Sequence, residues 1–508
     1  MASRIIRVVI LVLVLGCCYG FVERAFQILP YQYCLNIEEG VVLYAAQLLI
    51  ERGSYFFDIN QPPYFHASHA PIYIIASAIL GELFGQTLLA ARAVTTISFL
   101  LCTVLIYRVL RLQGADRLLA AICSLMFPAA WFVQSWGSVA LPDSLALALT
   151  LFGIYLHLKP GAGSLRLLSL AALVAAVFTK QSYISGLLAV GLAGSLGNDD
   201  RRGLGPILVF VVGLVGFTGG ILQLYTNGEF LKHLLEYGSP APFLPSRAAV
   251  SYLAFVKDSF ALLILILIAL LITRRSNLSG PHPLLLIYWL LTILGLAGMG
   301  KESANSSDYF EAYAATLIMT GVSIVRLSSI SSRIEEFWFS NLALLIFVAG
   351  MYSNQAPKLP EYVTDKNLAS PVAEIVAEIQ QTPGIVLSED LGLPLKAGAQ
   401  PEIGQSLQLA QLQLLGKWDP AALIERCDRK EFQLIIVEWR LLSVEGIAAC
   451  LEKNYLLKKK IGDFSLYHPA GKPPKNKHKP RKQPLKKEGT AGRPGAPSTL
   501  LDTPAYLS

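Results

Sequence analysis

Residues 258–273 of the chain read DSFALLILILIALLIT, and Arg274 and Arg275 follow directly. An apolar run of this kind is typical of a helix that crosses a lipid bilayer, which needs about 20 mainly apolar residues, with a range of about 17–25. The two arginines mark the cytoplasmic end of such a helix, because Lys and Arg accumulate in the short loops on that side. The stretch therefore predicts a membrane span that ends on the cytoplasmic side after residue 273.

The composition of the whole chain agrees with this prediction. Of its 508 residues, 54% are hydrophobic and only 15% are charged, and the mean hydropathy is +0.51. Soluble proteins contain about 25% charged residues. The apolar runs are confined to the first part of the chain, so we predict a membrane domain at residues 1–353, a water-soluble domain at 365–470 and a basic tail at 471–508.

Ten further apolar runs lie in the membrane domain, which predicts a polytopic α-helical membrane protein with about eleven spans. The spans are predicted at residues 5–25, 87–107, 118–135, 143–158, 166–180, 182–197, 205–226, 258–273, 284–299, 309–326 and 337–353. The first run begins after Arg4 and lacks a clean small-x-small cleavage site before Glu23, so we interpret it as an uncleaved span rather than a signal peptide.

The basic residues fix the predicted orientation. With the N-terminus in the cytoplasm, each predicted inner connection carries at least two positive residues. These are Arg4 and Arg7, then Arg108, Arg111 and Arg117, then Lys159 and Arg166, then Arg201 and Arg202, then Arg274 and Arg275, and finally Arg326 and Arg333. The segment 71–85 (PIYIIASAILGELFG) is too short to span and would invert this pattern, so we predict a helix along the outer interface. An odd number of spans places the soluble domain on the exoplasmic side.

The soluble domain alternates strand and helix patterns, which predicts a small α/β fold. Helices are expected at 371–381, 406–415, 419–430 and 443–454, and strands at 384–390 and 433–439 with a strand pair at 456–467. The domain has no Gly-rich phosphate loop and no nucleophile elbow, so we expect an accessory or acceptor-facing role.

Two features of the exoplasmic part stay open at this stage. Cys427 and Cys450 either form a disulfide or remain free thiols, and no C-x-x-C metal pair exists. The stretch KPPKNKHKPRKQPLKK at 472–487 predicts a disordered basic tail, which is either only solvated or contacts anionic lipid, polyanionic glycan or nucleic acid. This tail accounts for the net charge of +7, so that charge says little about a site in the body of the protein.

Ionisable residues collect at the predicted outer face. Glu38 and Glu39 follow the first span, and adjacent carboxylates beside a membrane are costly unless they are solvated, paired or used. Asp143 and Asp308 lie at the outer mouths of the fourth and tenth spans, where each could also serve as a helix N-cap.

Basic residues join them at the same face. Lys180 and Lys301 lie at span ends, where a single lysine usually extends its ammonium to the interface, and Arg247 is a third candidate. Carboxylates can act as a base or hold a divalent metal, whereas cationic side chains can bind a lipid phosphate.

Taken in order, these motifs resemble those of the GT-C glycosyltransferases, specifically family 39 with its protein O-mannosyltransferases and lipid A aminoarabinose transferases. The resemblance covers roughly residues 30–330. The matching segments are Glu38-Glu39-Gly40, Gly53-Ser54-Tyr55, His69-Ala70-Pro71-Ile72-Tyr73, Asp143, Phe178-Thr179-Lys180-Gln181 and Asp308-Tyr309-Phe310-Glu311. The first acid of the family motif is usually Asp, and here it is Glu38, so the base is either Glu38 or Glu39, with Glu38 favoured by its spacing to Gly53.

The resemblance implies transfer of a sugar from a polyprenyl-phosphate donor to a hydroxyl of a lipid, glycan or protein at the outer face of the plasma or inner membrane, with inversion. No nucleic acid is expected as a partner. The implied catalytic residues are Glu38, Glu39 and Asp143, and the donor-phosphate residues are Lys180, Lys301 and Arg247. The implied acceptor or substrate residues are His69, Tyr73, Gln181, Asp308, Tyr309 and Glu311. No cofactor is required with certainty, and a divalent metal held by Glu39 and Asp143 stays an option.

Two other classes of protein compete with an enzyme. A transporter or flippase would be expected to show inverted repeats and broken helices near the midplane, whereas here the sequence shows no repeat and the ionisable residues gather at one surface. A catalytically silent scaffold that binds through its exoplasmic domain has no need for acids at all the family positions.

Overall fold

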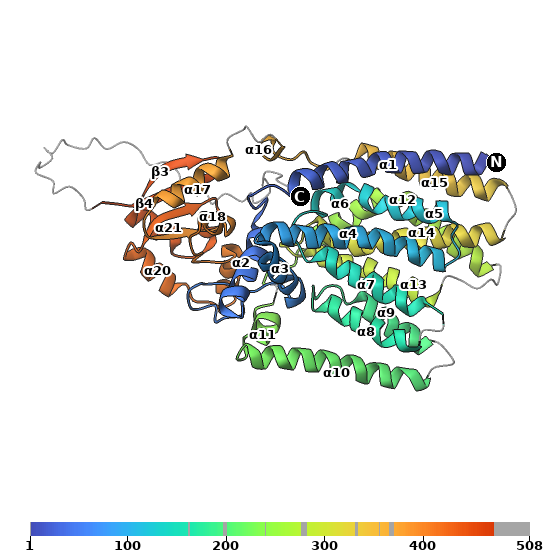
Figure 1. Ribbon diagram of the computed structural model, residues 1–508, viewed down its shortest axis with the longest axis horizontal. Coiled ribbons are helices and arrows are strands. Elements are labelled where there is room, and N and C mark those ends of the chain that lie inside the picture. The colour runs from blue at the N-terminus through green and yellow to red at the C-terminus, as the bar shows by residue number, and fades with distance from the viewer. Residues whose placement is uncertain are drawn as a thin grey trace, which may run out of the picture.

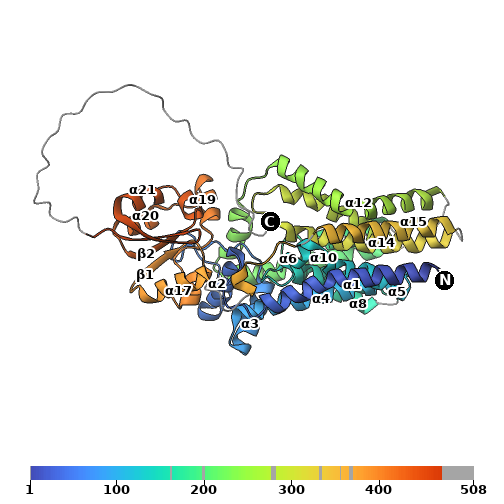
Figure 2. The ribbon, with the colours of Figure 1, turned by 90° about the horizontal axis from the view of Figure 1, so that it is seen from above.

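The structure of the protein is a computed structural model. It describes residues 2–160, 163–196, 201–238, 240–275, 282–330, 334–354, 356–364 and 370–471. A bundle of long helices forms one part of the molecule, and a smaller domain that contains the sheet lies at one end of the bundle (Figures 1 and 2). The basic tail predicted at 471–508 lies outside the described residues, apart from Gly471.

The helical part begins with α1 and ends with α16, and its long helices run along the long axis of the molecule (Figure 1). Its elements are α1 (Ala2–Ile28), α2 (Ile37–Arg52), α3 (Pro71–Phe84), α4 (Thr87–Leu112), α5 (Arg117–Ala129), α6 (Trp131–Trp136), α7 (Asp143–Leu158), α8 (Gly163–Val177), α9 (Ser185–Leu196), α10 (Arg201–Tyr225), α11 (Glu229–Leu231), η1 (Lys232–Tyr237), α12 (Pro245–Arg275), α13 (Pro283–Gly295), η2 (Leu296–Gly300), η3 (Ser306–Tyr309), α14 (Phe310–Ile330), α15 (Ile334–Ser353) and α16 (Glu361–Thr364).

Every predicted span coincides with helix, so the prediction of a polytopic helical membrane protein is confirmed. Six helices of the described part are long and apolar enough to cross a bilayer, and the others are shorter apolar helices. The exact number of spans stays a prediction. The run at 118–135 is broken into α5 and α6, because Pro128 lies in the last turn of α5 and Ala130 is extended (φ −70°, ψ 138°).

The helix predicted at 71–85 is present as α3. Pro71 occupies its first turn, and Gly85 ends it with a positive φ of 67°. A Cβ at Gly81 would lie 2.8 Å from Thr87 Oγ1, so this glycine permits the sharp turn into α4. Figures 1 and 2 show α3 at the end of the bundle, where it runs across the direction of α4 rather than beside it, a direction that suits an interfacial helix.

The smaller domain has the α/β fold that the sequence predicts. Its elements are α17 (Pro371–Gln381), β1 (Ile385–Ser388), α18 (Gly392–Ala397), α19 (Ser406–Leu414), α20 (Ala421–Asp428), β2 (Phe432–Val437), η4 (Arg440–Ser443), α21 (Ile447–Asn454), β3 (Tyr455–Ile461) and β4 (Phe464–Pro469). The strand order is β1-β2-β4-β3, with β1 and β2 parallel and the other neighbours antiparallel. The short helix α18 and the 3-10 helix η4 were not expected. Cys427 and Cys450 form a disulfide between α20 and α21, which settles the alternative that the sequence left open.

The domain is attached to the first outer loop by backbone pairing. Tyr64 N donates to Glu402 O at 3.2 Å, and Gly404 N donates to Tyr64 O at 2.7 Å. Helix α2 also packs on α18, where a Cβ at Gly40 would lie 2.9 Å from Gly392 N. The glycine of the Glu-Glu-Gly motif is therefore required for this close approach, and the contact brings the domain against the start of α2.

Candidate active site

Helix α2 turns its two consecutive glutamates in different directions. Asn36 caps the helix, since its side-chain oxygen accepts from Glu39 N at 3.0 Å. Successive residues of an α-helix point about 100° apart, so the two carboxylates cannot enter the same space. Glu39 is buried against Arg92, whereas Glu38 lines a cavity at the end of the bundle.

This cavity has a volume of about 550 Å³ and lies where the bundle meets the smaller domain. The side chain of Glu38 is 35% exposed, and its Oε2 accepts a hydrogen bond from Gln405 Nε2 at 3.0 Å. His69 Nε2 lies 3.6 Å from the same oxygen. Because Gln405 belongs to the smaller domain, both parts of the protein build the surroundings of Glu38.

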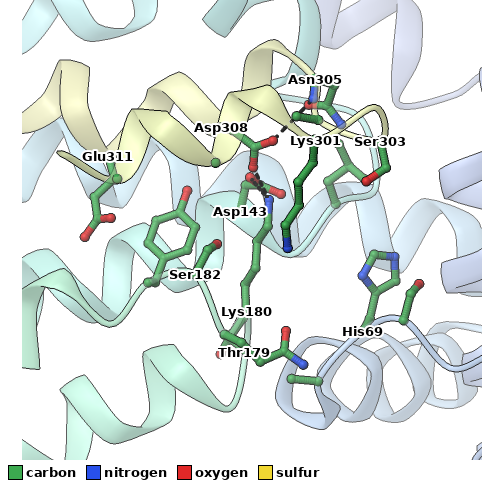
Figure 3. Close-up of a pocket in the computed structure, with 18 of the residues that line it drawn as sticks. His69, Asp143, Thr179, Lys180, Ser182, Lys301, Ser303, Asn305, Asp308 and Glu311 are labelled. Carbon is green, nitrogen blue, oxygen red and sulfur yellow. Dashed lines mark hydrogen bonds and ion pairs between the residues drawn. The ribbon is translucent and has the colours of Figure 1, made fainter. Parts of the chain in front are cut away.

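A compact charged cluster occupies the middle of the cavity (Figure 3). Lys180 Nζ lies 2.7 Å from Asp143 Oδ1 and 2.7 Å from Asp308 Oδ1. Burial alone would lower the pKa of Lys180, but the two carboxylates outweigh burial and raise the pKa above its usual value. The ammonium group of Lys180 is therefore already paired with two carboxylates.

The cluster is assembled from three elements. Asp143 begins α7, Asp308 lies in η3 just before α14, and Lys180 lies in the turn between α8 and α9. Ser307 Oγ lies 3.0 Å from Asp143 Oδ1, and Asn305 forms a reciprocal capping box with Asp308. These hydrogen bonds orient the two carboxylates at helix starts, and Lys180 reaches both carboxylates from its turn.

Two further ionisable groups lie at either side of this cluster. The ammonium group of Lys301 points toward the Asp143–Lys180 pair (Figure 3), and it has no hydrogen-bond or ion-pair partner within the described ranges. Glu311 lies at the end of the cavity opposite His69 (Figure 3). Its Oε2 accepts from Ser185 Oγ at 3.2 Å. Lys301 is thus the cation that remains available to an anionic ligand.

The structure brings most of the residues singled out by the sequence into this one cavity. Those that line it are Glu38, His69, Asp143, Lys180, Gln181, Lys301, Asp308 and Glu311. Their common placement is a geometric finding, and their chemical roles stay predictions.

Four residues that we assigned to the site lie elsewhere. Glu39 is sealed by Arg92, and the hydroxyl of Tyr73 is buried against Ala91 O and Thr95 Oγ1. The hydroxyl of Tyr309 donates to a backbone oxygen of α12, and the exposed side chain of Arg247 donates to Ala304 O. These four residues do not line the cavity, which the sequence could not reveal because local sequence does not show which face of a helix docks inward, and their roles stay predictions.

The two residues of the proposed metal pair have different surroundings. Glu39 is bound by Arg92, whereas Asp143 lines the cavity, where Lys180 Nζ lies 2.7 Å from both Asp143 and Asp308. In the part of the chain that the structure describes, no group of three or more His, Cys, Asp or Glu side chains could hold a metal ion. The involvement of a divalent metal stays an untested prediction.

Several lining residues carry no signal that can be recognised in the sequence. His233 of η1 and Gln408 of α19 both line the cavity. Gln408 is more than 300 positions from the His66 side chain that it contacts at 2.8 Å. A glutamine in an amphipathic helix carries no chemical signature, so only the docking of the smaller domain reveals it.

The helical bundle with a small α/β domain at one end is an arrangement that this chain shares with solved structures of other proteins. Among solved structures, ArnT from Cupriavidus metallidurans in the apo state has a TM-score of 0.60 and 11% identity, covering 88% of this chain and 96% of ArnT. ArnT bound to undecaprenyl phosphate has a TM-score of 0.59 and 13% identity, with 91% and 97% coverage.

A more distant structural neighbour comes from an archaeon. The apo oligosaccharyltransferase of Archaeoglobus fulgidus has a TM-score of 0.52 and 10% identity, covering 88% of this chain and 72% of that protein. No family model and no curated protein matches the sequence. The resemblance inferred from the sequence motifs is therefore confirmed as a resemblance of fold.

Proposed function

We propose that the protein is a glycosyltransferase that moves a sugar from a polyprenyl-phosphate donor to a hydroxyl group of an acceptor. The observation that carries the proposal is that Glu38 and Lys301 line one cavity together with the Asp143–Lys180–Asp308 cluster. A potential base and an available cation are the two groups that such a transfer needs. The likeness of the fold to ArnT, of which one structure holds undecaprenyl phosphate, supports the choice of donor.

The residues suggest a direct displacement. The acceptor oxygen attacks the anomeric carbon while Glu38 takes the proton of the hydroxyl group. The bond between the anomeric carbon and the phosphate oxygen breaks, and the polyprenyl phosphate leaves with the electron pair. Lys301 stabilises the charge that develops on this phosphate, since its ammonium is not neutralised by a carboxylate. A single displacement inverts the anomeric centre.

Lys180 has a different role in this scheme. With Asp143 and Asp308 it forms a cluster that carries one net negative charge, so it is poorly suited to attract a phosphate by charge alone. The cluster instead fixes two carboxylates whose remaining oxygens can accept hydrogen bonds from hydroxyl groups of the donor sugar.

We place the cavity on the exoplasmic side of the membrane. The arginine-rich connections predict that the opposite end of the bundle faces the cytoplasm. The disulfide between Cys427 and Cys450 is in keeping with an oxidising compartment for the smaller domain.

The test is an assay of donor turnover with the full-length purified protein. The protein is incubated with a panel of polyprenyl-phosphate sugars and an acceptor mixture, and release of polyprenyl phosphate is followed. Release that depends on Glu38 supports the proposal, and Glu51→Gln is the matched control because Glu51 lies exposed on the same helix. Movement of an intact donor across vesicles without release would identify a flippase instead and overturn the proposal.

A further inference from the structure

The cavity is divided into a charged half and an uncharged half. The charged half contains the Asp143–Lys180–Asp308 cluster and Lys301. The uncharged half is built by the loop that precedes α3, by η1 and by α19, and its lining side chains are Ser68, His69, His233, Leu234 and Gln408. Figure 3 shows His69 on the side of Lys301 away from the Asp143–Lys180 pair, and Glu38 lies with His69 at the boundary.

The two histidines behind this half are held in their neutral form. His233 accepts from Ala67 N at 3.0 Å through Nδ1, and its Nε2 lies 2.8 Å from Phe57 O, to which it can donate. Both ring nitrogens are therefore used without a second proton. Burial lowers the pKa of His233 to about 4 and that of His66 to about 4.

The glutamines of α19 and the loop before it face this half from the smaller domain. Gln408 Oε1 is 2.8 Å from His66 Nδ1, and its amide nitrogen has no partner within the described ranges. Gln405 is buried and donates to one oxygen of Glu38, which leaves the other oxygen of Glu38 open to a ligand. A carboxamide both donates and accepts hydrogen bonds, which suits hydroxyl groups rather than a phosphate.

We propose that the uncharged half is the acceptor subsite and that it takes an uncharged polyhydroxyl group, that is, a sugar residue of a glycan. The proposal rests on the proposed function and names its acceptor class. A phosphorylated acceptor in this half would meet the carboxylate of Glu38, and the unneutralised cation of the described cavity wall, Lys301, lies on the donor side. A sugar hydroxyl can instead accept a hydrogen bond from the amide nitrogen of Gln408 and give its proton to the free oxygen of Glu38.

Gln405 acts as a positioning residue in this subsite. Its hydrogen bond fixes the carboxylate of Glu38 by one oxygen, so the other oxygen keeps a constant direction toward the acceptor. The smaller domain is thereby part of the acceptor site and not only a cover.

The experiment compares acceptors that differ only in charge. Full-length protein is assayed with a neutral oligosaccharide and with the same oligosaccharide phosphorylated, and KM for acceptor, KM for donor and kcat are measured for wild type, Gln408→Leu and Gln405→Leu. We expect the neutral acceptor to be preferred. We expect Gln408→Leu to raise the KM for the neutral acceptor by up to about tenfold, which is the effect of one lost hydrogen bond. The KM for the donor should be unchanged. Gln405→Leu should lower kcat more than it changes either KM.

The control is Gln413→Leu, since Gln413 lies on the same helix but bonds to Glu445 within the smaller domain. Binding of the neutral oligosaccharide without donor is measured in parallel, so that a folded variant with low turnover is still informative. Preference for the phosphorylated acceptor, or a neutral-acceptor KM that Gln408→Leu does not change, would overturn the inference while donor turnover still supports the proposed function. Absence of polyprenyl phosphate release from every donor would overturn both.

Discussion

The carboxylate of Glu39 and the guanidinium of Arg92 form a bidentate ion pair, with Nε 2.8 Å from Oε1 and Nη2 2.6 Å from Oε2. Both side chains are 0% exposed. Arg92 also donates to the backbone oxygens of Ile28, Tyr31 and Tyr33, and Glu39 accepts from the amides of Leu35 and Ala140. This pair joins α2, α4 and the end of α1, so Glu39 is a structural residue and Glu38 is left to face the cavity.

Breaking this pair should destabilise the protein. Arg92→Met leaves the Glu39 carboxylate buried without its counter-ion, and removing one partner of a buried pair costs about 3–5 kcal/mol. We expect a clear fall in the apparent melting temperature of the purified protein in detergent. Arg117→Met, at an exposed arginine, is the control. A wild-type melting temperature for Arg92→Met would mean that the pair does not hold these helices together.

Replacing Glu38 should lower activity and leave the stability of the protein unchanged. Glu38→Gln keeps the size of the side chain but removes the base, and general-base catalysis contributes about 10²–10⁴-fold. We expect turnover to fall by about that factor, while the melting temperature and donor binding stay near those of wild type. Glu51→Gln should match wild type in all three measurements. If Glu38→Gln transfers sugar at the normal rate, Glu38 is not the base.

The buried histidines should make stability sensitive to acid. The pKa values of His66 and His233 are about 4 in the folded protein, below the unfolded value of about 6.5. The folded state thus favours the neutral rings, and this contribution is present above about pH 6.5 and is lost as the pH falls toward 4. We expect a lower melting temperature at pH 5 than at pH 7.5. His233→Gln should be less stable at pH 7.5 but should lose less on acidification, and an unchanged pH dependence in that variant would argue against this assignment.

Removal of Lys180 from the charged cluster should make the stability of the protein depend on pH with the opposite sign, so that the variant is less stable at high pH. In the wild type the raised pKa of Lys180 keeps the ammonium charged, so its contribution is present below the unfolded pKa of about 10.4 and is lost only at higher pH. Lys180→Met leaves Asp143 and Asp308 facing each other, and a proton on one of them relieves the repulsion. We expect this variant to melt at a lower temperature at pH 8 than at pH 5.5, relative to wild type.

A second substitution tests the cause of this effect. The double variant Lys180→Met/Asp308→Asn removes the repulsion, so it should recover much of the stability that Lys180→Met loses at pH 8. Lys180→Arg should keep most of the wild-type stability at pH 8, because the positive charge is retained. Failure of the double variant to recover would show that repulsion between the carboxylates is not what the lysine relieves.

Local patterns were sufficient for the fold and for grouping most of the site residues at one end of the bundle. Hydropathy located the helices of the bundle, and periodicity located every strand of the smaller domain, because both depend on neighbouring residues. Asp143, Lys180 and Asp308 were predicted at the same end of the bundle, and in the structure they form ion pairs with one another through Lys180. The different fates of Glu38 and Glu39 depend on how α2 docks against Arg92, which is more than 50 positions away. The contact of Gln405 with Glu38 joins residues 367 positions apart, and no local pattern encodes such a pairing.

The orientation of the bundle can be tested by chemical labelling of cysteine. We expect Ser303→Cys, at an exposed position beside the cavity, to react with a membrane-impermeant thiol reagent added outside sealed cells or vesicles. Arg117→Cys, exposed at the opposite end of the bundle at the start of α5, should react only after the membrane is permeabilised. The experiment requires a background in which the free cysteines Cys17, Cys18, Cys34, Cys102 and Cys123 are replaced. Labelling of both positions after permeabilisation is the control for access. If Arg117→Cys were instead labelled from outside, the cavity would face the cytoplasm. That result would contradict the orientation predicted from the Lys and Arg residues of the short loops.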